Sequence, residues 1–371
     1  MKIMFFTLTL RGGGAERVLT VLANEMSKES EVSILTIHND DDYYEVNSKI
    51  HRLCIDNKKR DRNAIIANKM RKISPLRIKK LISIIRREKP DVVITFLPLP
   101  SLYITLAKTI DKYVKKVPVI LSERGDPNKE YRNKLIALLA KKLYKEANGF
   151  VFQTKDAEDF FRKSISDNSI IIENPVNGDF LNHSVVEKRR DVIVSCGRLE
   201  KQKNFELLIN AFSDIESKFP NYTLEIYGEG SKRDELLKYI RKINLDEKII
   251  LKGRVDNLAD SIYDAKLFVL SSDYEGMPNA LMEAMALGLP CISTDCPIGG
   301  PKALIKNGKN GILVEVNNKE QLSSSMSKVL SDPVLFLKLS ENGMIKVKKY
   351  TAKNVAEKWK KFIKDIVGEY E

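Results

Sequence analysis

The feature that most constrains the fold is a repeated alternation of short apolar runs with longer segments of helical periodicity. The first half of the chain has such runs near residues 2–8, 31–36, 92–97, 118–122 and 149–153. This rhythm is typical of a parallel sheet with crossover helices, because strands buried on both faces are almost wholly apolar. The sequence therefore predicts an α/β fold.

The alternation is interrupted once and then begins again. Residues Ile171 to Phe180 read IIENPVNGDF, and this density of Asn, Pro and Gly indicates a domain boundary. New apolar runs follow near residues 192–196, 223–228, 249–252, 267–271, 290–293 and 312–314. Because 371 residues correspond to about two domains of ordinary size, we expect two similar α/β domains in tandem.

The cysteines and the first residues favour a reducing compartment. The four cysteines form no CxxC pair, which argues against a disulfide framework and a zinc site. A glycine cluster and an acid follow the apolar N-terminal run, so we interpret this run as a buried strand and not as a secretion signal. The longest uncharged stretch, Val92 to Ala107, is too short to span a membrane and contains two prolines. We therefore expect a cytoplasmic protein.

The net charge of +13 is concentrated in one segment. Between Lys58 and Lys89 there are thirteen Lys or Arg residues but two acids, Asp61 and Glu88. Apolar residues recur there at broadly helical spacing, broken at Pro75, which predicts a basic surface that contacts anionic lipid. A solvated helix is the alternative, and the lack of aromatic residues argues against nucleic acid. The candidate membrane-facing bases are Lys58, Lys59, Arg60, Arg71, Lys72, Lys79 and Lys80.

The first motif that bears on chemistry is RGGGAERV at residues 11–18. Three glycines after an apolar strand allow close approach of a ligand, and the next helix offers free N–H groups to a phosphate. The spacing does not match the GxGxxG dinucleotide fingerprint. Phosphate binding and a plain tight turn both remain open for this loop.

The second motif, CGRLEKQKNFELLINAF at residues 196–212, predicts a strand that ends at Gly197 and a helix that starts near Asn204. Arg198 and Lys203 then lie on one loop at the carboxyl edge of a parallel sheet, where open α/β folds bind ligands. Two cations at this edge suit a diphosphate. An ordinary charged loop is the alternative.

The third motif, SDYEGMPNALMEAMALGLP at residues 272–290, reads as loop, helix and turn. Glu275 falls in the loop, Pro278 at a first helical position, and Asn279 at a possible cap. Glu283 follows inside the helix among small and apolar residues. Because a carboxylate is costly to bury without a partner, we favour a binding role for it over a solvated position. A fourth stretch, GGPKALI at residues 299–305, is a weak signal by itself.

Taken in order, the motifs GGGAE, GRLEKQKN, EGMPNALMEAMALGLP and GGPKALI resemble family 4 of the glycosyltransferases, and the similarity covers nearly the whole chain. More narrowly, the chain resembles bacterial members that extend capsule, exopolysaccharide or lipid-linked oligosaccharide chains. The resemblance implies the GT-B fold, with two Rossmann-like domains facing across a cleft. It implies an acceptor-side domain at 1–175, a nucleotide-sugar domain at 185–350, and a last helix at 351–371 that returns to the first domain, which gives the apolar stripe around Trp359 a surface to pack on.

The resemblance also implies roles for single residues. Arg198 and Lys203 correspond to residues that neutralise the donor diphosphate, and Glu283 to one that holds the ribose. Glu275 corresponds to a residue that contacts the donor sugar. The neighbouring donor-site positions are Gly276, Met277, Pro278 and Asn279, while Gly13 and Gly14 are expected to approach the phosphate from across the cleft. The resemblance implies retention of anomeric configuration, a UDP-sugar donor, and an acceptor glycan linked to polyprenyl diphosphate at the inner face of the membrane.

One departure from the family concerns the loop Ser122 to Pro127, which reads SERGDP where many relatives carry a His. We therefore take Arg124 as the candidate catalytic residue of this loop, with Glu123 and Asp126 as its neighbours.

Three other interpretations were weighed. The acids Asp40, Asp41 and Asp42 could hold Mg²⁺ or Mn²⁺, but the triplet lacks a partner cluster, and Arg198 with Lys203 already supplies positive charge. We therefore expect no metal cofactor. A sugar-nucleotide epimerase or hydrolase and a membrane-associated non-enzymatic binder are the alternative functions.

Overall fold

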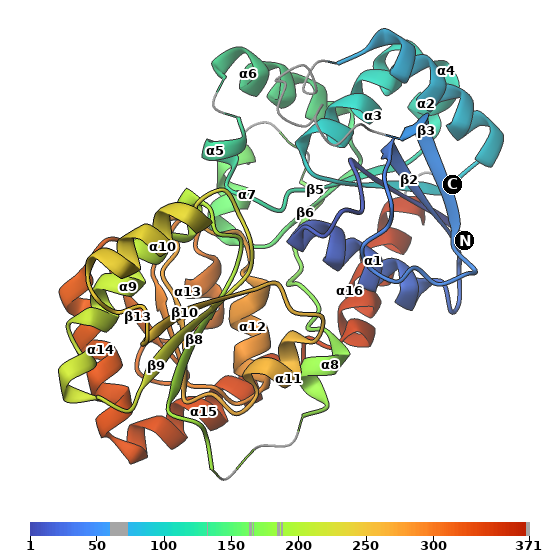
Figure 1. The fold of residues 1–371 in the computed structure, drawn as a ribbon. Coiled ribbons are helices and arrows are strands. Elements are labelled where there is room, and N and C mark those ends of the chain that lie inside the picture. The colour runs from blue at the N-terminus through green and yellow to red at the C-terminus, as the bar shows by residue number, and fades with distance from the viewer. Residues whose placement is uncertain are drawn as a thin grey trace. The chain divides into compact units, whose positions relative to one another are not determined.

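The computed structural model describes residues 1–59, 73–131, 133–162, 165, 167–183, 186 and 188–368. The chain divides into two compact units: unit 1 comprises Met1–Pro175 and Ala352–Glu371, and unit 2 comprises Val176–Thr351. Each unit is a parallel sheet with helices packed on it (Figure 1). The predicted fold class of two Rossmann-like domains is confirmed.

Unit 1 contains a seven-stranded sheet in the order β3-β2-β1-β4-β5-β6-β7. Its strands are β1 (Lys2–Thr7), β2 (Glu31–Asn39), β3 (His51–Lys59), β4 (Val92–Phe96), β5 (Val119–Ser122), β6 (Gly149–Phe152) and β7 (Ser169–Ile171). The central strand β1 reads KIMFFT and is buried from Ile3 onward, as expected of a parallel strand that is covered on both faces. In its register, Phe5 lies between Ile34 of β2 and Ile94 of β4.

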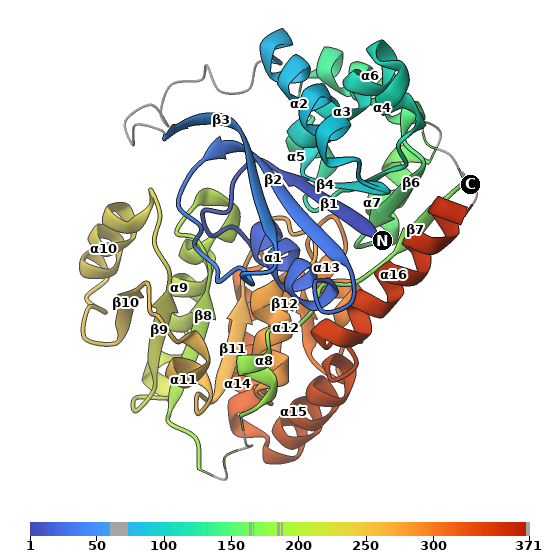
Figure 2. The ribbon, with the colours of Figure 1, turned by 90° about the vertical axis from the view of Figure 1, so that its right-hand side faces the viewer.

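The helices of unit 1 lie on two faces of this sheet. They are α1 (Gly14–Met26), α2 (Pro75–Glu88), α3 (Pro98–Ile110), α4 (Lys112–Lys116), α5 (Pro127–Glu130), α6 (Lys134–Leu143), α7 (Lys155–Phe161) and α16 (Ala352–Gly368). Along the sheet, the connection from β1 to β2 runs in the opposite direction to that from β4 to β5. Because crossovers between parallel strands are right-handed, connections that run in opposite directions lie on opposite faces of the sheet. One face therefore carries α1 and α16, and the other carries α2, α3, α4 and α6 (Figure 2).

The C-terminal helix α16 packs in unit 1, as predicted. The indole of Trp359 is fully buried and stacks on Phe96 of β4, with ring centroids 6.0 Å apart. Gly149 of β6 faces the same helix, and a Cβ at this position would lie 3.0 Å from both Phe362 and Ile366. The apolar stripe of α16 therefore has its packing surface on the sheet of the first domain.

Unit 2 contains a six-stranded sheet in the order β10-β9-β8-β11-β12-β13. Its strands are β8 (Val192–Cys196), β9 (Thr223–Tyr227), β10 (Ile249–Gly253), β11 (Leu267–Leu270), β12 (Cys291–Thr294) and β13 (Ile312–Val314). Its helices are α8 (Gly178–Leu181), α9 (Phe205–Ser213), α10 (Arg233–Lys242), α11 (Leu258–Ile262), α12 (Asn279–Ala286), α13 (Gly300–Leu304), α14 (Lys319–Ser331) and α15 (Pro333–Val347). All six strands were predicted from the sequence.

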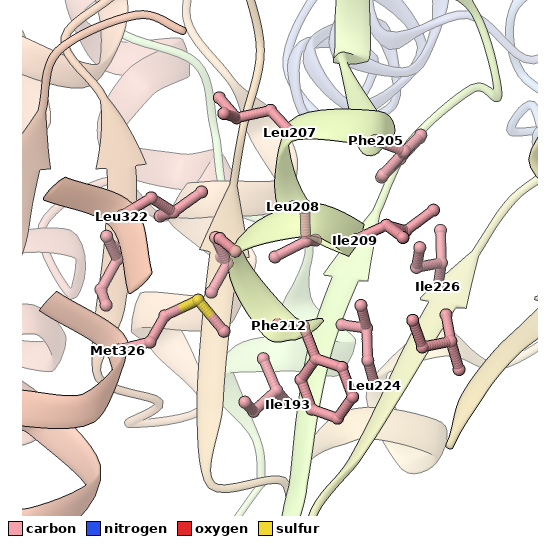
Figure 3. Close-up of a cluster of buried hydrophobic side chains, with 14 of the residues drawn as sticks. Ile193, Phe205, Leu207, Leu208, Ile209, Phe212, Leu224, Ile226, Leu322 and Met326 are labelled. Atoms are coloured by element: carbon pink, nitrogen blue, oxygen red, sulfur yellow. The ribbon is translucent and has the colours of Figure 1, made fainter. Parts of the chain in front are cut away.

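The core of unit 2 forms where α9 and α14 cover the sheet (Figure 3). Leu208 and Phe212 of α9 point to Ile193 and Leu224 of the strands, and Met326 of α14 lies beside them. All five side chains are fully buried. This packing fixes the position of the loop that enters α9, which carries two of the predicted site residues.

The segment around residue 58 differs from the sequence prediction. Residues His51–Lys59 form the edge strand β3, so Lys58 and Lys59 lie in a strand and not in a helix. Helix α2 begins at Pro75, which occupies its first turn, where its missing N–H and fixed φ are favourable. The sequence prediction missed β3 and the short β7, because neither has a long apolar run. Arg60, Arg71 and Lys72 lie outside the described residues.

Candidate functional site

The candidate site of unit 2 lies where the strand order changes direction. Strands β8 and β11 are neighbours, but the chain leaves β8 toward β9 and leaves β11 toward β12. Where loops diverge in this way, open α/β folds bind ligands at the carboxyl edge of the sheet, and we call this edge, between the loops after β8 and β11, the crevice of unit 2. The GRLEKQKN loop follows β8, and the loop that contains Glu275 follows β11. The fold therefore brings the second and third sequence motifs together.

An ion pair joins these two loops. Nζ of Lys203 lies 2.5 Å from Oε1 of Glu275, and both side chains are largely buried. The hydroxyl of Ser272 donates to the same carboxylate oxygen at 2.6 Å. A lysine has three donors and holds a point charge, so Lys203 retains capacity for a second anionic partner. The pair orients a cation and an acid at the crevice.

Further hydrogen bonds connect the loop after β8 to the loop after β11. Gln202 Nε2 donates to the carbonyl of Tyr274 at 2.8 Å, and the N–H of Asp273 donates to the carbonyl of Gln202 at 2.8 Å. The Ser271 hydroxyl donates to the carbonyl of Lys203 at 2.9 Å. Ser271, Ser272 and Gln202 were not among the residues predicted from the sequence, although the two serines directly follow a buried strand. Their role is to position Lys203 and Glu275.

The fourth motif supports the third. Gly300 packs so closely on the loop after β11 that a Cβ would lie 1.5 Å from the carbonyl oxygen of Gly276. Next to Gly276, the backbone of Glu275 forms two hydrogen bonds with the segment before Gly300. The N–H of Glu275 donates to the carbonyl of Pro297 at 2.7 Å, and the N–H of Ile298 donates to the carbonyl of Glu275 at 3.0 Å. Any side chain at position 300 displaces this loop. The weak GGP signal therefore has a physical role in holding Glu275 in place.

Helix α12 carries the second acid. It begins at Asn279 with Pro278 as its N-cap, and no side-chain cap is formed, so the predicted capping role of Asn279 is wrong. Glu283 lies within the helix and is only 3% exposed. Met277, in the preceding loop, is also buried. The alternative of a solvated Glu283 is therefore excluded. A buried carboxylate at this position requires hydrogen-bonding partners, which is consistent with a ligand-binding or structural role.

The second cation, Arg198, lies on the same loop as Lys203 but is exposed. A second glycine pair supports its loop: a Cβ at Gly228 would lie 1.9 Å from the carbonyl oxygen of Gly197, and the φ of Gly228 is +134°. This support was not recognised in the sequence. Arg198 thus lies on a firmly packed loop, and its side chain is exposed.

The glycine loop of unit 1 has a different arrangement. The carboxylate of Glu16 accepts hydrogen bonds from the N–H groups of Gly12 at 2.9 Å and Gly13 at 2.7 Å, and the hydroxyl of Thr9 donates to its other oxygen. Glu16 is buried and forms a capping box at the start of α1, which begins at Gly14. The chain's own acid therefore takes the amide of Gly13 that we expected to meet a phosphate. Phosphate binding by Gly13 and Gly14 stays a prediction.

Arg124 is a buried residue of unit 1. Its guanidinium lies 4.3 Å from the ring centroid of Phe96 and 5.6 Å from that of Trp359, and Nη1 donates to Asn174 Oδ1 at 2.8 Å. Burial lowers its pKa to about 9. These contacts join the loop after β5 to β4 and α16. A catalytic role for Arg124 stays a prediction, and the contacts in the structure are those of a packing residue.

The neighbouring Glu123 is also buried. Its Oε1 accepts hydrogen bonds of 2.9 Å from the hydroxyls of both Tyr131 and Tyr144, and burial raises its pKa to about 7. Asp126 caps α5 by accepting from the N–H of Asn128 at 2.9 Å. The acids of the loop Ser122 to Pro127 thus hold the segment that follows it.

Two of the three acids that could have bound a metal are paired with arginines. Asp40 lies 2.9 Å from Arg11, and Asp42 accepts two hydrogen bonds, of 2.7 and 2.8 Å, from Arg52. In the part of the chain that the structure describes, no group of three or more His, Cys, Asp or Glu side chains could hold a metal ion. Within the same ranges, no helix has both the length and the apolar character needed to cross a membrane.

Models of two families match the chain. The model described as Glycosyl transferases group 1 matches residues 179–365, and the model described as Glycosyltransferase Family 4 matches residues 12–180. The first match begins near the division between the units and contains the crevice of unit 2. Together the two matches cover both units.

Relatives of known name are similar over nearly the whole length. A Campylobacter jejuni GalNAc-alpha-(1->4)-GalNAc-alpha-(1->3)-diNAcBac-PP-undecaprenol alpha-1,4-N-acetyl-D-galactosaminyltransferase is 27% identical over 99% of both chains. A second C. jejuni enzyme, N-acetylgalactosamine-N,N'-diacetylbacillosaminyl-diphospho-undecaprenol 4-alpha-N-acetylgalactosaminyltransferase, is 29% identical over 90% of this chain and 91% of its own.

Solved structures share the fold. Sucrose-phosphate synthase from Thermosynechococcus elongatus superimposes with a TM-score of 0.84 at 16% identity, and covers 99% of both chains. HepE from Anabaena in complex with UDP superimposes with a TM-score of 0.79 at 15% identity, over 98% of this chain and 100% of its own. At such identities the likeness concerns the fold alone. From the motifs, the two parallel sheets and the family models, we conclude that the chain belongs to the family Glycosyl transferases group 1 and is a glycosyltransferase.

Proposed function

We propose that the protein transfers a hexose or N-acetylhexosamine from a nucleotide diphosphate sugar to a glycan linked to polyprenyl diphosphate. The proposed donor is a UDP-sugar. The observation that carries this proposal is the pair of Lys203 and Glu275 at the crevice of unit 2, close along the chain to exposed Arg198 and buried Glu283. Cations and acids in this arrangement suit the diphosphate and the hydroxyl groups of a nucleotide sugar.

The roles follow from the chemistry of each group. Arg198 and Lys203 neutralise the diphosphate, and the carboxylate of Glu283 accepts hydrogen bonds from the ribose hydroxyls. Glu275 contacts the sugar while it keeps Lys203 oriented. The loop of Gly276, Met277, Pro278 and Asn279 borders the sugar, because it joins Glu275 to the uncapped start of α12.

We propose that transfer retains the anomeric configuration. The bond from the sugar C1 to the phosphate oxygen breaks, and the bond from C1 to the acceptor oxygen forms on the same face. The acceptor proton passes to the departing phosphate oxygen, so UDP is the leaving group. The protein then contributes mainly by positioning the reactants and by stabilising the charge that develops on the diphosphate.

The lipid-linked acceptor is supported by the names of the two C. jejuni relatives, both of which specify an undecaprenol-linked substrate. We propose that the enzyme works as a peripheral protein at the inner face of the cell membrane, where it would meet such an acceptor. We propose surface polysaccharide or oligosaccharide synthesis as its pathway, with Lys79 and Lys80 of α2 among the bases that meet anionic lipid. Both side chains are exposed.

One assay tests the activity. The purified protein is incubated with UDP- and GDP-sugars, with and without a polyprenyl-diphosphate-linked glycan, and the products are resolved by mass spectrometry. Growth of the lipid-linked glycan supports transfer. Sugar release or rearrangement that does not require the acceptor identifies a hydrolase or an epimerase, and complete inertness with every donor identifies a binder; either result refutes the proposal.

The same assay tests the cofactor prediction. If Arg198 and Lys203 supply the positive charge, the rate is unchanged when the protein is treated with EDTA and assayed without divalent ions. Loss of activity that Mg²⁺ or Mn²⁺ restores contradicts metal independence.

A further inference from the structure

The short helix α6 exposes large apolar side chains. Leu135 is 76% exposed and Leu138 is 68% exposed, while Ile136 and Leu139 are 43% and 41% exposed. Their spacing places Leu135 with Leu138 and Leu139 on adjoining turns of one side of the helix. Single exposed leucines are common on soluble proteins, but four within five residues form a contiguous apolar patch, which marks an interaction surface.

The inward side of α6 is made of smaller residues. Ala140 is fully buried, Ala137 is half-buried, and Leu143 is buried at the end of the helix. A helix that serves only the fold of its own domain places its large apolar residues inward and its polar residues outward. In α6 four of the five leucine and isoleucine residues are outward, which leaves them without a packing partner in the described part of unit 1.

The helix is held firmly to the domain. Asn133 caps its start by accepting a hydrogen bond of 2.9 Å from the N–H of Leu135. Tyr131 before the helix and Tyr144 after it both donate to the carboxylate of buried Glu123. The apolar patch is therefore displayed on an anchored element.

The sheet face that carries α6 is strongly basic. Helices α2, α3, α4 and α6 share one face of the sheet (Figure 2), and they contain twelve Lys or Arg residues and one acid, Glu88. On the opposite face, α1 and α16 contain six Lys or Arg residues and four acids. The exposed bases on the first face are Lys79, Lys80, Arg86, Arg87, Lys112, Lys115, Lys116 and Lys142. Leu76, Ile110 and Tyr113 add exposed apolar groups among them.

We infer that α6 inserts its leucine side into the boundary between headgroups and acyl chains of an anionic lipid bilayer, while the bases of α2 and α4 contact the headgroups. Helices with an apolar side and a lysine-rich margin bind membranes in this way. A second copy of the chain fits less well, because a symmetric contact would bring two strongly basic faces together. The inference rests on the proposed function, since a lipid-linked acceptor gives the bilayer contact its purpose.

Vesicle binding tests the inference without turnover. The full chain is sedimented with vesicles of phosphatidylcholine alone and of phosphatidylcholine with phosphatidylglycerol. Two double variants are compared: Leu135→Ser with Leu138→Ser on α6, and Val334→Ser with Leu337→Ser on α15. The α15 residues are 78% and 58% exposed, so they match the α6 pair in exposure and chemistry.

We expect the wild type and the α15 variant to bind the anionic vesicles alike. The α6 variant is expected to lose about tenfold or more in partition coefficient, because two leucines no longer leave water on binding. Raised salt should weaken the wild type, which reflects the basic contribution. Equal binding by all three proteins overturns the inference, as does a wild-type dimer in solution that the α6 substitutions dissociate.

Two further measurements are needed. A tryptophan variant and an activity assay show that the substituted proteins are folded, and the activity assay distinguishes failure of the proposed sugar transfer from failure of membrane insertion by α6. With Leu138→Trp, the emission should shift to the blue when anionic vesicles are added; an unshifted spectrum counts against insertion. Transfer to a detergent-solubilised acceptor should be equal in the wild type and the α6 variant. If no protein transfers sugar but α6-dependent vesicle binding persists, the proposed function fails and the membrane surface stands.

Discussion

The two units use the charged groups at their sheet edges in different ways. In unit 2, Lys203 and Glu275 come from loops after two adjacent strands and pair with each other at the crevice. In unit 1, the charge beside the glycine loop belongs to Glu16, which satisfies the amides of Gly12 and Gly13. The same fold thus pairs charges between two neighbouring loops in one unit and pairs a charge with its own backbone in the other.

The comparison extends to the arginines. Arg198 of unit 2 is exposed on its loop, whereas Arg124 of unit 1 is buried between aromatic rings. Motifs with similar residue types can therefore differ in function, because the number of partners that the fold supplies differs. The following predictions test whether chemistry resides in unit 2 and structural support in unit 1.

The largest effect is expected for Lys203→Ala. Loss of a positioned cation that stabilises the leaving diphosphate should lower kcat/KM by about 100- to 1000-fold. The measurement is initial-rate kinetics with the donor identified in the screen. Lys201→Ala is the matched control, since Lys201 lies on the same loop but is exposed. Similar losses for both lysines would mean that general loop charge matters and not the pair with Glu275.

A pair of glutamates provides the second test. Glu283→Gln should weaken binding of the nucleotide sugar about 10- to 100-fold, because a hydrogen bond to a charged group contributes about 1.5–3 kcal/mol. Glu16→Gln should leave the donor Kd within about twofold and lower the melting temperature, since a capping box contributes about 1 kcal/mol to stability. Calorimetric titration and thermal denaturation give the two values. If donor affinity falls equally in both variants, the proposed difference between Glu283 and Glu16 is contradicted, and phosphate binding by the glycine loop is supported.

Arg124→Ala should act on stability. Removing the guanidinium from its contacts with Phe96 and Trp359 leaves a cavity and removes one hydrogen bond to Asn174, so we expect the free energy of unfolding to fall by about 2–4 kcal/mol. Urea denaturation measures the change. A large fall in kcat with unchanged stability would instead assign Arg124 to catalysis.

The smallest effect concerns pH. The pKa of Glu123 is raised to about 7 by burial, above the 4.5 that it has when exposed. The folded protein therefore holds a proton that the unfolded chain releases, and stability declines as the pH rises from about 4.5 through 7. Glu123→Gln removes this titration, so the melting temperature of the variant relative to the wild type should increase between pH 5 and pH 8. A difference that is constant over this range refutes the assignment.

Much of the architecture could be predicted because its signals are local. The apolar runs identified all six strands of unit 2 and five of the seven in unit 1, and the Asn-Pro-Gly text lies where the units divide. The edge strand β3 was missed because HRLCIDNKK has few apolar residues. An edge strand is partly solvated, so its composition resembles that of a loop or a helix surface.

The candidate site was only partly predictable. Glu275, Glu283 and Lys203 could be chosen from their residue types and positions, but Ser272 and Gln202 could not. Ser272 directly follows a buried strand, but nothing local marks its hydroxyl as the donor to Glu275, and the partner of Gln202 lies on another strand's loop. The same holds for Gly300, whose close approach to Gly276 depends on how two loops pack.

By itself, the sequence determined the two parallel sheets, the order of the motifs and the residue types available at each sheet edge, because periodicity and turn composition act over a few residues. Only the tertiary structure decided which charges are paired. Lys203 meets Glu275 across 72 positions of sequence, while Glu16 meets its glycines within four. A charge is neutralised by whatever the fold brings within a few ångströms of it, and that proximity is a property of the packed chain.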